Sequence, residues 1–344
     1  MRHRRGFGAR VLRGQYPQSF IDDKQLSGYQ AGMSLTARLS GRLFAPLFAV
    51  TMLAGSAIAP AQQHLPSPQP LQAEAAPVQA RPALWKIADH DTTIYLFGTI
   101  HLLPEGIDWF HGPVANAFEH SDLLLTELPD VAGGDVMAAV MKYATLPQGQ
   151  SLRARMTDEQ RGKYEAALAS LGLPKSMFDR NKPWMAALSL PLVKLQRAGF
   201  NPEQGVENQL AQRNKALGRT RAGLETIDFQ FGAFNTLSET EQMDYLMEVV
   251  GALPEVDTAI GTMIQTWSRG DAEGLASQLN AEEDMPALAD ALIYSRNRTW
   301  AKWIEARLKQ PGTVFMAVGA GHLAGMGSVQ QVLAKAGIKT ARVQ

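Results

Sequence analysis

Two histidines of this 344-residue sequence follow the same local pattern, an apolar run and then Gly-x-x-His. His101 ends residues 98–101, and His322 ends residues 319–322. Each apolar run predicts a strand, and a glycine at the end of a strand lets the backbone approach a ligand closely. Because open α/β sheets bind ligands at the carboxyl ends of their strands, we predict that both imidazoles face one site.

A carboxylate follows a third apolar run, since Glu127 comes directly after Leu-Leu-Leu-Thr at 123–126. Two imidazoles and one carboxylate are a known hydrolytic metal set that leaves positions open for water and substrate. The sequence has no cysteine, so any metal must be held by His, Asp and Glu. We therefore predict that His101, His322 and Glu127 hold a divalent metal, for which Mn, Co and Zn are all chemically suitable.

A structural interpretation stands beside the metal site. A lone histidine at a strand end is more often a hydrogen-bonded structural residue, and Glu127 could be a solvated strand end. The repetition of the pattern favours function for the two histidines. A carboxylate after an apolar run also needs a partner if it is buried, and a metal or histidine would supply one.

Four further polar residues are weaker candidates. Arg296 and Asn297 lie in a predicted helix before the second motif, where they would bind a substrate carbonyl or carboxylate or lie on a solvated helix face. Glu225 is predicted to be a further ligand or to orient a histidine. Glu207 is considered for the same role.

The elements that position these residues predict an α/β fold. The predicted strands are rich in apolar residues and lie at 84–88, 93–97, 123–128, 219–225, 313–318 and 340–343. Residues 135–306 show helical periods and N-terminal caps, and short helices are predicted at 113–120 and 327–336. We expect a central mixed or mostly parallel sheet flanked by helices, with a large, mainly helical middle segment between the two Gly-x-x-His strands.

The N-terminal residues 1–61 are expected to be an extension and a signal peptide. Arg38 and Arg42 precede the apolar run 43–54, and small residues follow it, which is the layout of a secretory signal peptide. Met33 is a candidate for the true start of translation. The alternative is an uncleaved inner-membrane anchor facing the periplasm, but the run is shorter than the ~20 residues of a membrane span.

The remaining sequence predicts one folded domain. Residues 62–82 are rich in Pro and Gln and are expected to be a flexible linker, followed by a domain at 83–344. Without residues 1–61, 25 basic and 31 acidic residues remain, a net charge of −6, so no nucleic-acid partner is expected. The content of 45% hydrophobic residues excludes a disordered chain, and no pattern indicates an oligomeric state.

Taken in order, five motifs resemble those of the TraB/GumN (TraB/PrgY/GumN) family. They are residues 95–104, 126–129, 224–230, 296–297 and 317–325. That family is related to the Tiki membrane metalloproteases and, more distantly, to erythromycin-esterase-like and haem-uptake proteins. The resemblance covers about residues 84–343.

The resemblance implies a metal-dependent hydrolytic site. Its functional positions would be His101, Glu127 and His322, with Arg296 and Asn297 as further members. The sequence departs from the family pattern at Glu207, where Asp is expected after Gly-Val.

Two function classes follow from the sequence. The first is an exported metal-dependent hydrolase, peptidase-like, that acts on a peptide or small molecule in the periplasm or outside the cell, with no stable membrane span after cleavage. The second is a non-catalytic periplasmic protein that binds a peptide or small molecule in the same site.

Cleavage of the signal peptide can be tested directly. The N-terminus of the protein purified from cells should lie near Pro60 or Gln62, because the alanine-rich residues 57–61 form the expected cleavage site. N-terminal sequencing checks this. A mature chain that keeps residues 43–54 in the membrane would show that the anchored alternative is correct.

Overall fold

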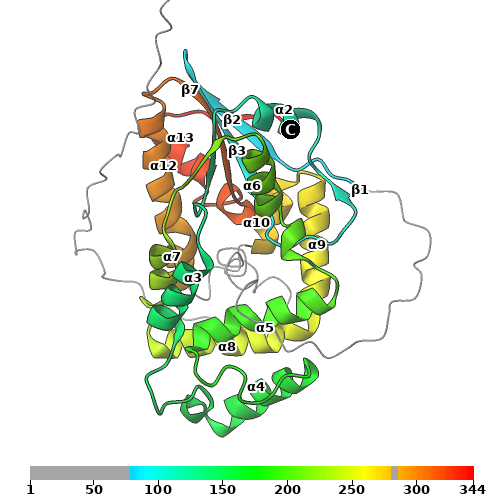
Figure 1. Ribbon diagram of the computed structural model, residues 1–344, viewed down its shortest axis with the longest axis vertical. Coiled ribbons are helices and arrows are strands. Elements are labelled where there is room, and N and C mark those ends of the chain that lie inside the picture. Colours follow the sequence, from blue (N-terminus) through cyan, green and yellow to red (C-terminus); the bar gives the residue numbers. More distant parts are fainter. Residues whose placement is uncertain (1–77, 280–285) are drawn as a thin grey trace, which may run out of the picture. The chain divides into compact units, whose positions relative to one another are not determined.

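A six-stranded mixed sheet forms the centre of the protein in its computed structural model, which describes residues 78–279 and 286–344 (Figure 1). The strands are β2 Leu84–Ala88, β3 Thr92–Thr99, β5 Leu123–Thr126, β6 Thr220–Gly223, β7 Gly312–Gly319 and β8 Ala341–Arg342. Their order is β6-β5-β7-β3-β2-β8. The predicted α/β fold with a mixed sheet flanked by helices is confirmed.

Strand direction differs between the two parts of the sheet. The four strands β6, β5, β7 and β3 are parallel to one another, whereas β2 is antiparallel to both β3 and β8. β2 and β3 form the predicted hairpin, because the carboxylate of Asp89 accepts hydrogen bonds from the backbone of Asp91 and Thr92 and closes the turn. The parallel strands need crossovers, which the helices provide.

Alternating side chains of the central strands enter two different hydrophobic clusters. In β7, Phe315 belongs to the larger cluster with the helical middle segment, and Met316 belongs to a cluster with Trp300 and Ile304. β3 alternates in the same way. Because successive residues of a strand point to opposite faces, the sheet separates two cores and is buried on both sides.

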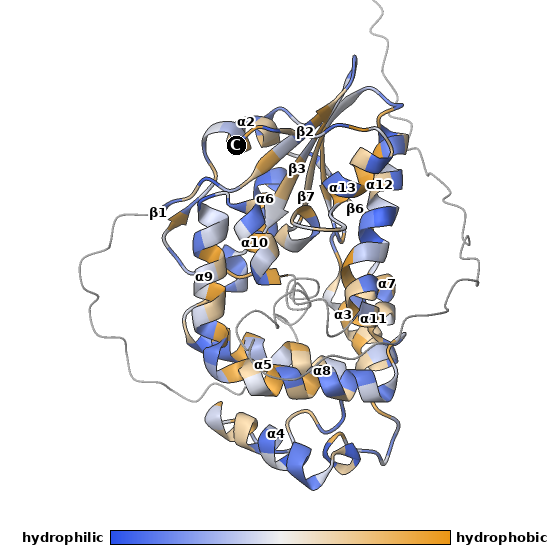
Figure 2. Ribbon diagram, turned by 180° about the vertical axis from the view of Figure 1, so that it is seen from behind, coloured by the Kyte–Doolittle hydropathy of each residue, from blue (hydrophilic) through white to orange (hydrophobic). Residues whose placement is uncertain are grey.

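The helices agree with the predicted helical middle segment. They are α2 Gly112–Glu119, α3 Gly133–Ala139, α4 Asp158–Ser170, α5 Pro183–Arg197, α6 Val206–Ala216, α7 Ile227–Phe234, α8 Glu239–Ala252, α9 Val256–Ser268, α10 Ala272–Leu279, α11 Pro286–Ala289, α12 Ser295–Arg307 and α13 Val329–Lys335. Capping boxes begin α4 and α8. α5 and α8 run side by side in both ribbon views, and α5 is largely hydrophobic (Figure 2).

None of the helices within residues 78–279 and 286–344 is both long enough and apolar enough to cross a membrane. The predicted signal peptide and residues 62–77 of the predicted linker lie outside the described residues. The end of that linker differs from the prediction. Strand β1 Val78–Gln79 pairs with β4 Ile107–Asp108, and the backbone of Arg81 donates to Ser268 at 2.6 Å, so ordered packing begins before residue 83.

The start of α6 contacts the loop that follows β3. The backbone nitrogen of Val206 donates to the carbonyl oxygen of Ile100 at 3.0 Å. A β-carbon at Gly205 would overlap the carbonyl oxygen of His101. Gly205 therefore permits the close approach that brings the next residue but one, Glu207, to the first Gly-x-x-His motif.

Replacing Gly205 by Ala should lower the free energy of unfolding by about 1–3 kcal/mol, because a methyl group has to displace backbone atoms. Urea unfolding measures the change. Gly162→Ala in α4 is the control, since a β-carbon there meets nothing within 4 Å, and it should stabilise the helix by about 0.5–1 kcal/mol. Equal stability of Gly205→Ala and the unchanged protein would contradict this role of Gly205.

Candidate functional site

Three of the predicted site residues lie just beyond the carboxyl ends of strands, at one edge of the sheet. Thr99 at the end of β3 is paired with Gly319 at the end of β7, and Thr126 at the end of β5 is paired with Ala317. His101, His322 and Glu127 follow these strand ends within three residues, and all are buried. The parallel register explains how residues over two hundred positions apart in sequence reach one edge.

Glu127 is held by charge and by hydrogen bonds. Its Oε1 accepts from the backbone nitrogen of Gly319 at 2.8 Å, which links β5 to β7. Its Oε2 accepts from Arg296 Nη2 at 2.5 Å and from Gln230 Nε2 at 3.2 Å. The carboxylate is therefore paired, as a buried charge requires, and is not a solvated strand end.

Arg296 is the cation at the centre of this site. Its Nε donates to the two oxygens of Glu225 at 2.9 and 3.1 Å, and its Nη1 donates to the carbonyl of Leu292 at 2.9 Å. The side chain is 2% exposed, so its placement on a solvated helix face is wrong. One buried guanidinium thus joins the carboxylates of Glu127 and Glu225.

Glu225 is surrounded by donors on the other side of the guanidinium. Trp300 Nε1 donates to it at 2.8 Å and Gln230 Nε2 at 3.1 Å. Burial raises the pKa of Glu225, and the charge of Arg296 opposes this effect without cancelling it. Gln230 and Trp300 were not predicted as site residues. The available signal was that Trp300 is four residues from Arg296 on a helix and hence on the same face.

His322 has a defined tautomer because Asn297 has a defined orientation. Asn297 Nδ2 donates to the carbonyl of Gly327 at 2.8 Å, so its Oδ1 faces His322 Nδ1 at 2.7 Å. Nδ1 must then carry the proton, and Nε2 accepts from Arg296 Nη1 at 3.2 Å. Burial lowers the pKa of His322 well below its usual value, and the charges of Arg296 and His101 add to this effect.

His101 is paired with a carboxylate instead of an amide. Its Nδ1 lies 2.7 Å from Glu207 Oε1, and the Thr99 hydroxyl donates to the same oxygen. Burial opposes ionisation of Glu207, but His101 and Thr99 more than offset it and lower its pKa. The residue that departs from the family pattern is therefore in contact with the first histidine.

The donor chemistry of these residues fits a divalent metal. Both imidazoles direct Nδ1 to an oxygen, which leaves Nε2 as the possible ligand atom of each, and metal-binding histidines are usually oriented in this way. Glu127 adds a carboxylate. The guanidinium of Arg296, however, lies against both Glu127 and His322 Nε2. Glu127 Oε1 is 3.8 Å from His322 Nε2.

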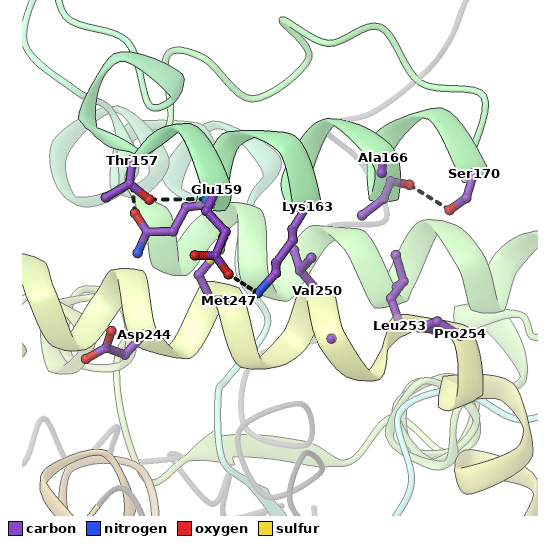
Figure 3. A pocket seen from close by; sticks show the side chains of 13 residues that line it. Thr157, Glu159, Lys163, Ala166, Ser170, Asp244, Met247, Val250, Leu253 and Pro254 are labelled. Atoms are coloured by element: carbon purple, nitrogen blue, oxygen red, sulfur yellow. Dashed lines mark hydrogen bonds and ion pairs between the residues drawn. The ribbon is translucent and has the colours of Figure 1, made fainter. Parts of the chain in front are cut away.

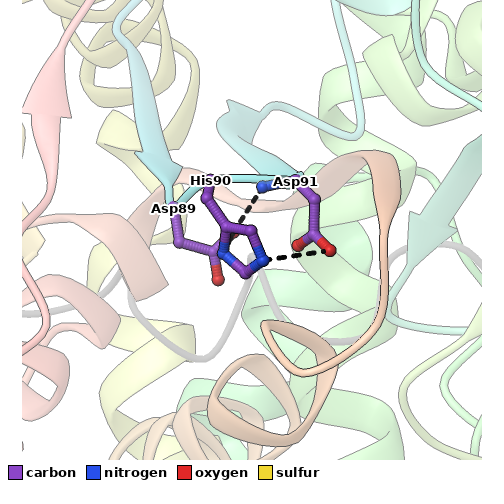
Figure 4. Close-up of side chains that lie close together, drawn as sticks. All are labelled: Asp89, His90 and Asp91. Atoms are coloured by element: carbon purple, nitrogen blue, oxygen red, sulfur yellow. Dashed lines mark hydrogen bonds and ion pairs between the residues drawn. The ribbon is translucent and has the colours of Figure 1, made fainter.

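A different group of His and Asp side chains has its possible metal-binding atoms close together. Within the described part of the chain, the one set of three His, Asp or Glu side chains whose ligand atoms all lie within 4.8 Å is Asp89, His90 and Asp91 (Figure 4). All three are exposed and lie in the turn before β3. They are thus at the amino end of β3, at the opposite end of the strand from the carboxyl edge, which is the edge of the sheet where the parallel strands have their carboxyl ends. Exposed acidic groups are common without an ion.

A groove between α4 and α8 is also separate from the site. Its lining includes Lys163, Ala167, Met247 and Val250 (Figure 3). None of the predicted site residues lines it. The groove therefore adds nothing to the chemistry at the carboxyl edge.

Several curated proteins are similar to this chain. The uncharacterized protein YbaP of Escherichia coli K12 is 24% identical over 244 residues, which cover 70% of this chain and 87% of YbaP. An uncharacterized protein of Treponema pallidum is 22% identical over 268 residues, 73% of this chain and 80% of that protein. The metalloprotease TIKI1 of Danio rerio is 24% identical over 309 residues, 74% of this chain and 61% of TIKI1.

No solved structure matches the chain. The TraB/PrgY/gumN family model matches residues 83–342. This range begins just before β2 and ends in β8, so it includes every strand of the central sheet and all the residues at its carboxyl edge. The chain therefore belongs to the TraB/PrgY/gumN family.

Proposed function

We propose that this protein is an exported metal-dependent hydrolase that cleaves bonds of the peptide type. The observation that carries the proposal is the matched orientation of His101 and His322 at one edge of the sheet, beside Glu127. Each imidazole has Nδ1 engaged by an oxygen and therefore has Nε2 as its ligand atom. The similarity to a protein named metalloprotease TIKI1 supports the same activity.

Each member of the site has a stated role in this proposal. His101 and His322 would hold the ion through Nε2, and Glu127 would be the third ligand or would accept a proton from water. A bound Mn, Co or Zn ion would lower the pKa of a water molecule and polarise the carbonyl group of a substrate. The substrate would be a peptide or a small molecule.

Asn297 and Glu207 act through the histidines. Asn297 contacts His322 through Oδ1 and the carbonyl of Gly327 through Nδ2, so we assign it the role of a positioning residue beside the catalytic role predicted from the sequence. Glu207 has the corresponding role for His101. Such partners fix the tautomer and the orientation of a metal-binding imidazole.

The proposed location is the periplasm or the exterior of the cell. It depends on the positive residues Arg38 and Arg42, the apolar run 43–54 and the small residues that follow. An exported enzyme without cysteine would also need no reducing compartment.

One observation favours a second candidate, a non-catalytic protein that binds a peptide or small molecule in the same site. Arg296 already satisfies Glu127 Oε2 and His322 Nε2. Stoichiometric metal in the purified protein, lost when the histidines are replaced, would favour the hydrolase. Binding of a peptide that survives chelation would favour the second candidate.

Replacing His322 by Ala should abolish tight metal binding and activity, because it removes one of the proposed ligands. A chelator should lower the melting temperature of the unchanged protein but hardly affect that of the variant. The double variant His101→Ala/His322→Ala should be hardly less active than either single one, since residues that act as a unit are non-additive. Peptide cleavage is measured with Mn, Co and Zn in turn. Cleavage by the double variant at the wild-type rate would show that the metallohydrolase hypothesis is wrong.

The neutral state of His322 predicts a pH dependence of stability in the metal-free protein. The folded imidazole, which faces Arg296, His101 and Glu127, has a pKa well below the value of 6.5 that applies after unfolding. Below pH 6.5 the unfolded chain therefore binds a proton that the folded chain does not. The free energy of unfolding should fall with falling pH by up to about 1.4 kcal/mol per unit.

Urea unfolding in EDTA at several pH values from about 8 down to about 5 measures this slope. His322→Gln should remove the contribution of His322, whereas the same substitution at His90, in the exposed turn, controls for the loss of an imidazole. A slope that is the same with and without His322 would contradict the assigned neutral state.

A further inference from the structure

Arg296 contacts the proposed ligands themselves. Its Nη2 lies 2.5 Å from Glu127 Oε2, and its Nη1 lies 3.2 Å from His322 Nε2. The side chain is 2% exposed. Two of the three proposed ligands thus already share a buried cation.

Arg296 and a metal ion would compete for the same atom of His322. The Nδ1 proton of His322 is directed to Asn297 Oδ1, so Nε2 has the single lone pair of the neutral ring. That lone pair accepts either the hydrogen of Arg296 Nη1 or a metal ion. The guanidinium and an ion on His322 Nε2 therefore exclude each other.

The charges of the neighbouring carboxylates support the same competition between Arg296 and a metal ion. Glu127 and Glu225 are buried, at 7% exposure for Glu127 and 4% for the side chain of Glu225, and each has an ion pair with Arg296. Without a cation these two carboxylates would be buried without compensation, which is strongly unfavourable. A divalent ion would supply the compensation that Arg296 supplies in its absence, and it would be repelled by Arg296.

We propose that Arg296 is a placeholder cation of the metal centre, which holds Glu127 and His322 in position in the metal-free protein and releases His322 Nε2 when an ion binds. This inference rests on the proposed metal-dependent function. It makes Arg296 a positioning residue of the metal-free site, not the group that contacts the substrate.

Other contacts keep the arginine attached during this exchange. Nε donates to Glu225 at 2.9 and 3.1 Å, independently of Glu127 and His322. The guanidinium carbon also lies 4.9 Å from the centre of the Trp300 ring. The exchange therefore requires a shift of the Nη groups and does not require the side chain to leave the protein interior.

The test compares Arg296→Gln with the unchanged protein in titrations with zinc, manganese and cobalt, followed by calorimetry. Loss of the positive charge should tighten metal binding by about tenfold or more, which is the size of the effect of one neighbouring charge on an ionisation equilibrium. In EDTA the variant should melt several degrees below the unchanged protein, because its two carboxylates lack a cation. Zinc should therefore raise its melting temperature more than that of the unchanged protein.

Two matched variants separate charge from other effects. Arg298→Gln changes an exposed arginine on the same helix, which is paired with Asp290 at 2.8 Å, and should alter neither metal affinity nor melting temperature. Arg296→Lys retains the positive charge, so its metal affinity should stay closer to that of the unchanged protein. Equal or weaker metal binding by Arg296→Gln overturns the placeholder role.

The outcomes distinguish this inference from the proposed function. If neither the unchanged protein nor Arg296→Gln binds any of the three metals, the metal-dependent function fails, and the inference fails with it. If the unchanged protein binds metal and Arg296→Gln binds it no more tightly, the inference alone fails.

A measurement on the unchanged protein covers the case in which Arg296→Gln does not fold. The guanidinium NMR signals of Arg296, assigned by their absence in Arg296→Lys, should shift during a zinc titration, because Nη1 leaves His322. Unchanged signals at saturating zinc overturn the proposal.

Discussion

The burial of Arg296 between Glu127 and Glu225 is the constraint on which the rest of the site depends. Each of these charges would be costly to bury alone, and together they are tolerated because every charged group has an oppositely charged partner and further hydrogen bonds. This network joins the carboxyl end of β5 to α12 and, through Gly319, to β7. The position of His322 follows from it, since Arg296 and Asn297 are adjacent on α12 and both contact the ring.

The two Gly-x-x-His motifs look equivalent in sequence, but their surroundings differ. The buried carboxylate of Glu207 faces His101, whereas the neutral amide of Asn297 faces His322. A carboxylate stabilises a positive ring and an amide does not, so the two imidazoles have different electrostatic environments at one edge of the sheet. The difference arises from α6 and α12, which approach the edge from different parts of the chain.

Membership of the family gives partial support to a metal-dependent activity. The chain belongs to the TraB/PrgY/gumN family, and a relative with 24% identity is named a metalloprotease, while others are uncharacterized. A shared fold does not by itself imply a shared activity. A metal would be held here by the donor set of this chain, and Arg296 Nη1 lies against His322 Nε2, the atom that would bind it.

The sequence by itself determined the class of fold, the positions of the strands in the central sheet and the grouping of His101, Glu127 and His322 at strand ends, because strand periodicity and terminal glycines are local signals. It did not reveal that Arg296 is buried, that Glu207 contacts His101, or that Gln230 and Trp300 belong to the site. These features depend on which helices pack against the carboxyl edge, and such contacts link residues far apart in the chain. Only the tertiary structure decided them, because whether a charge is buried and paired depends on its neighbours in space and not on its neighbours in sequence.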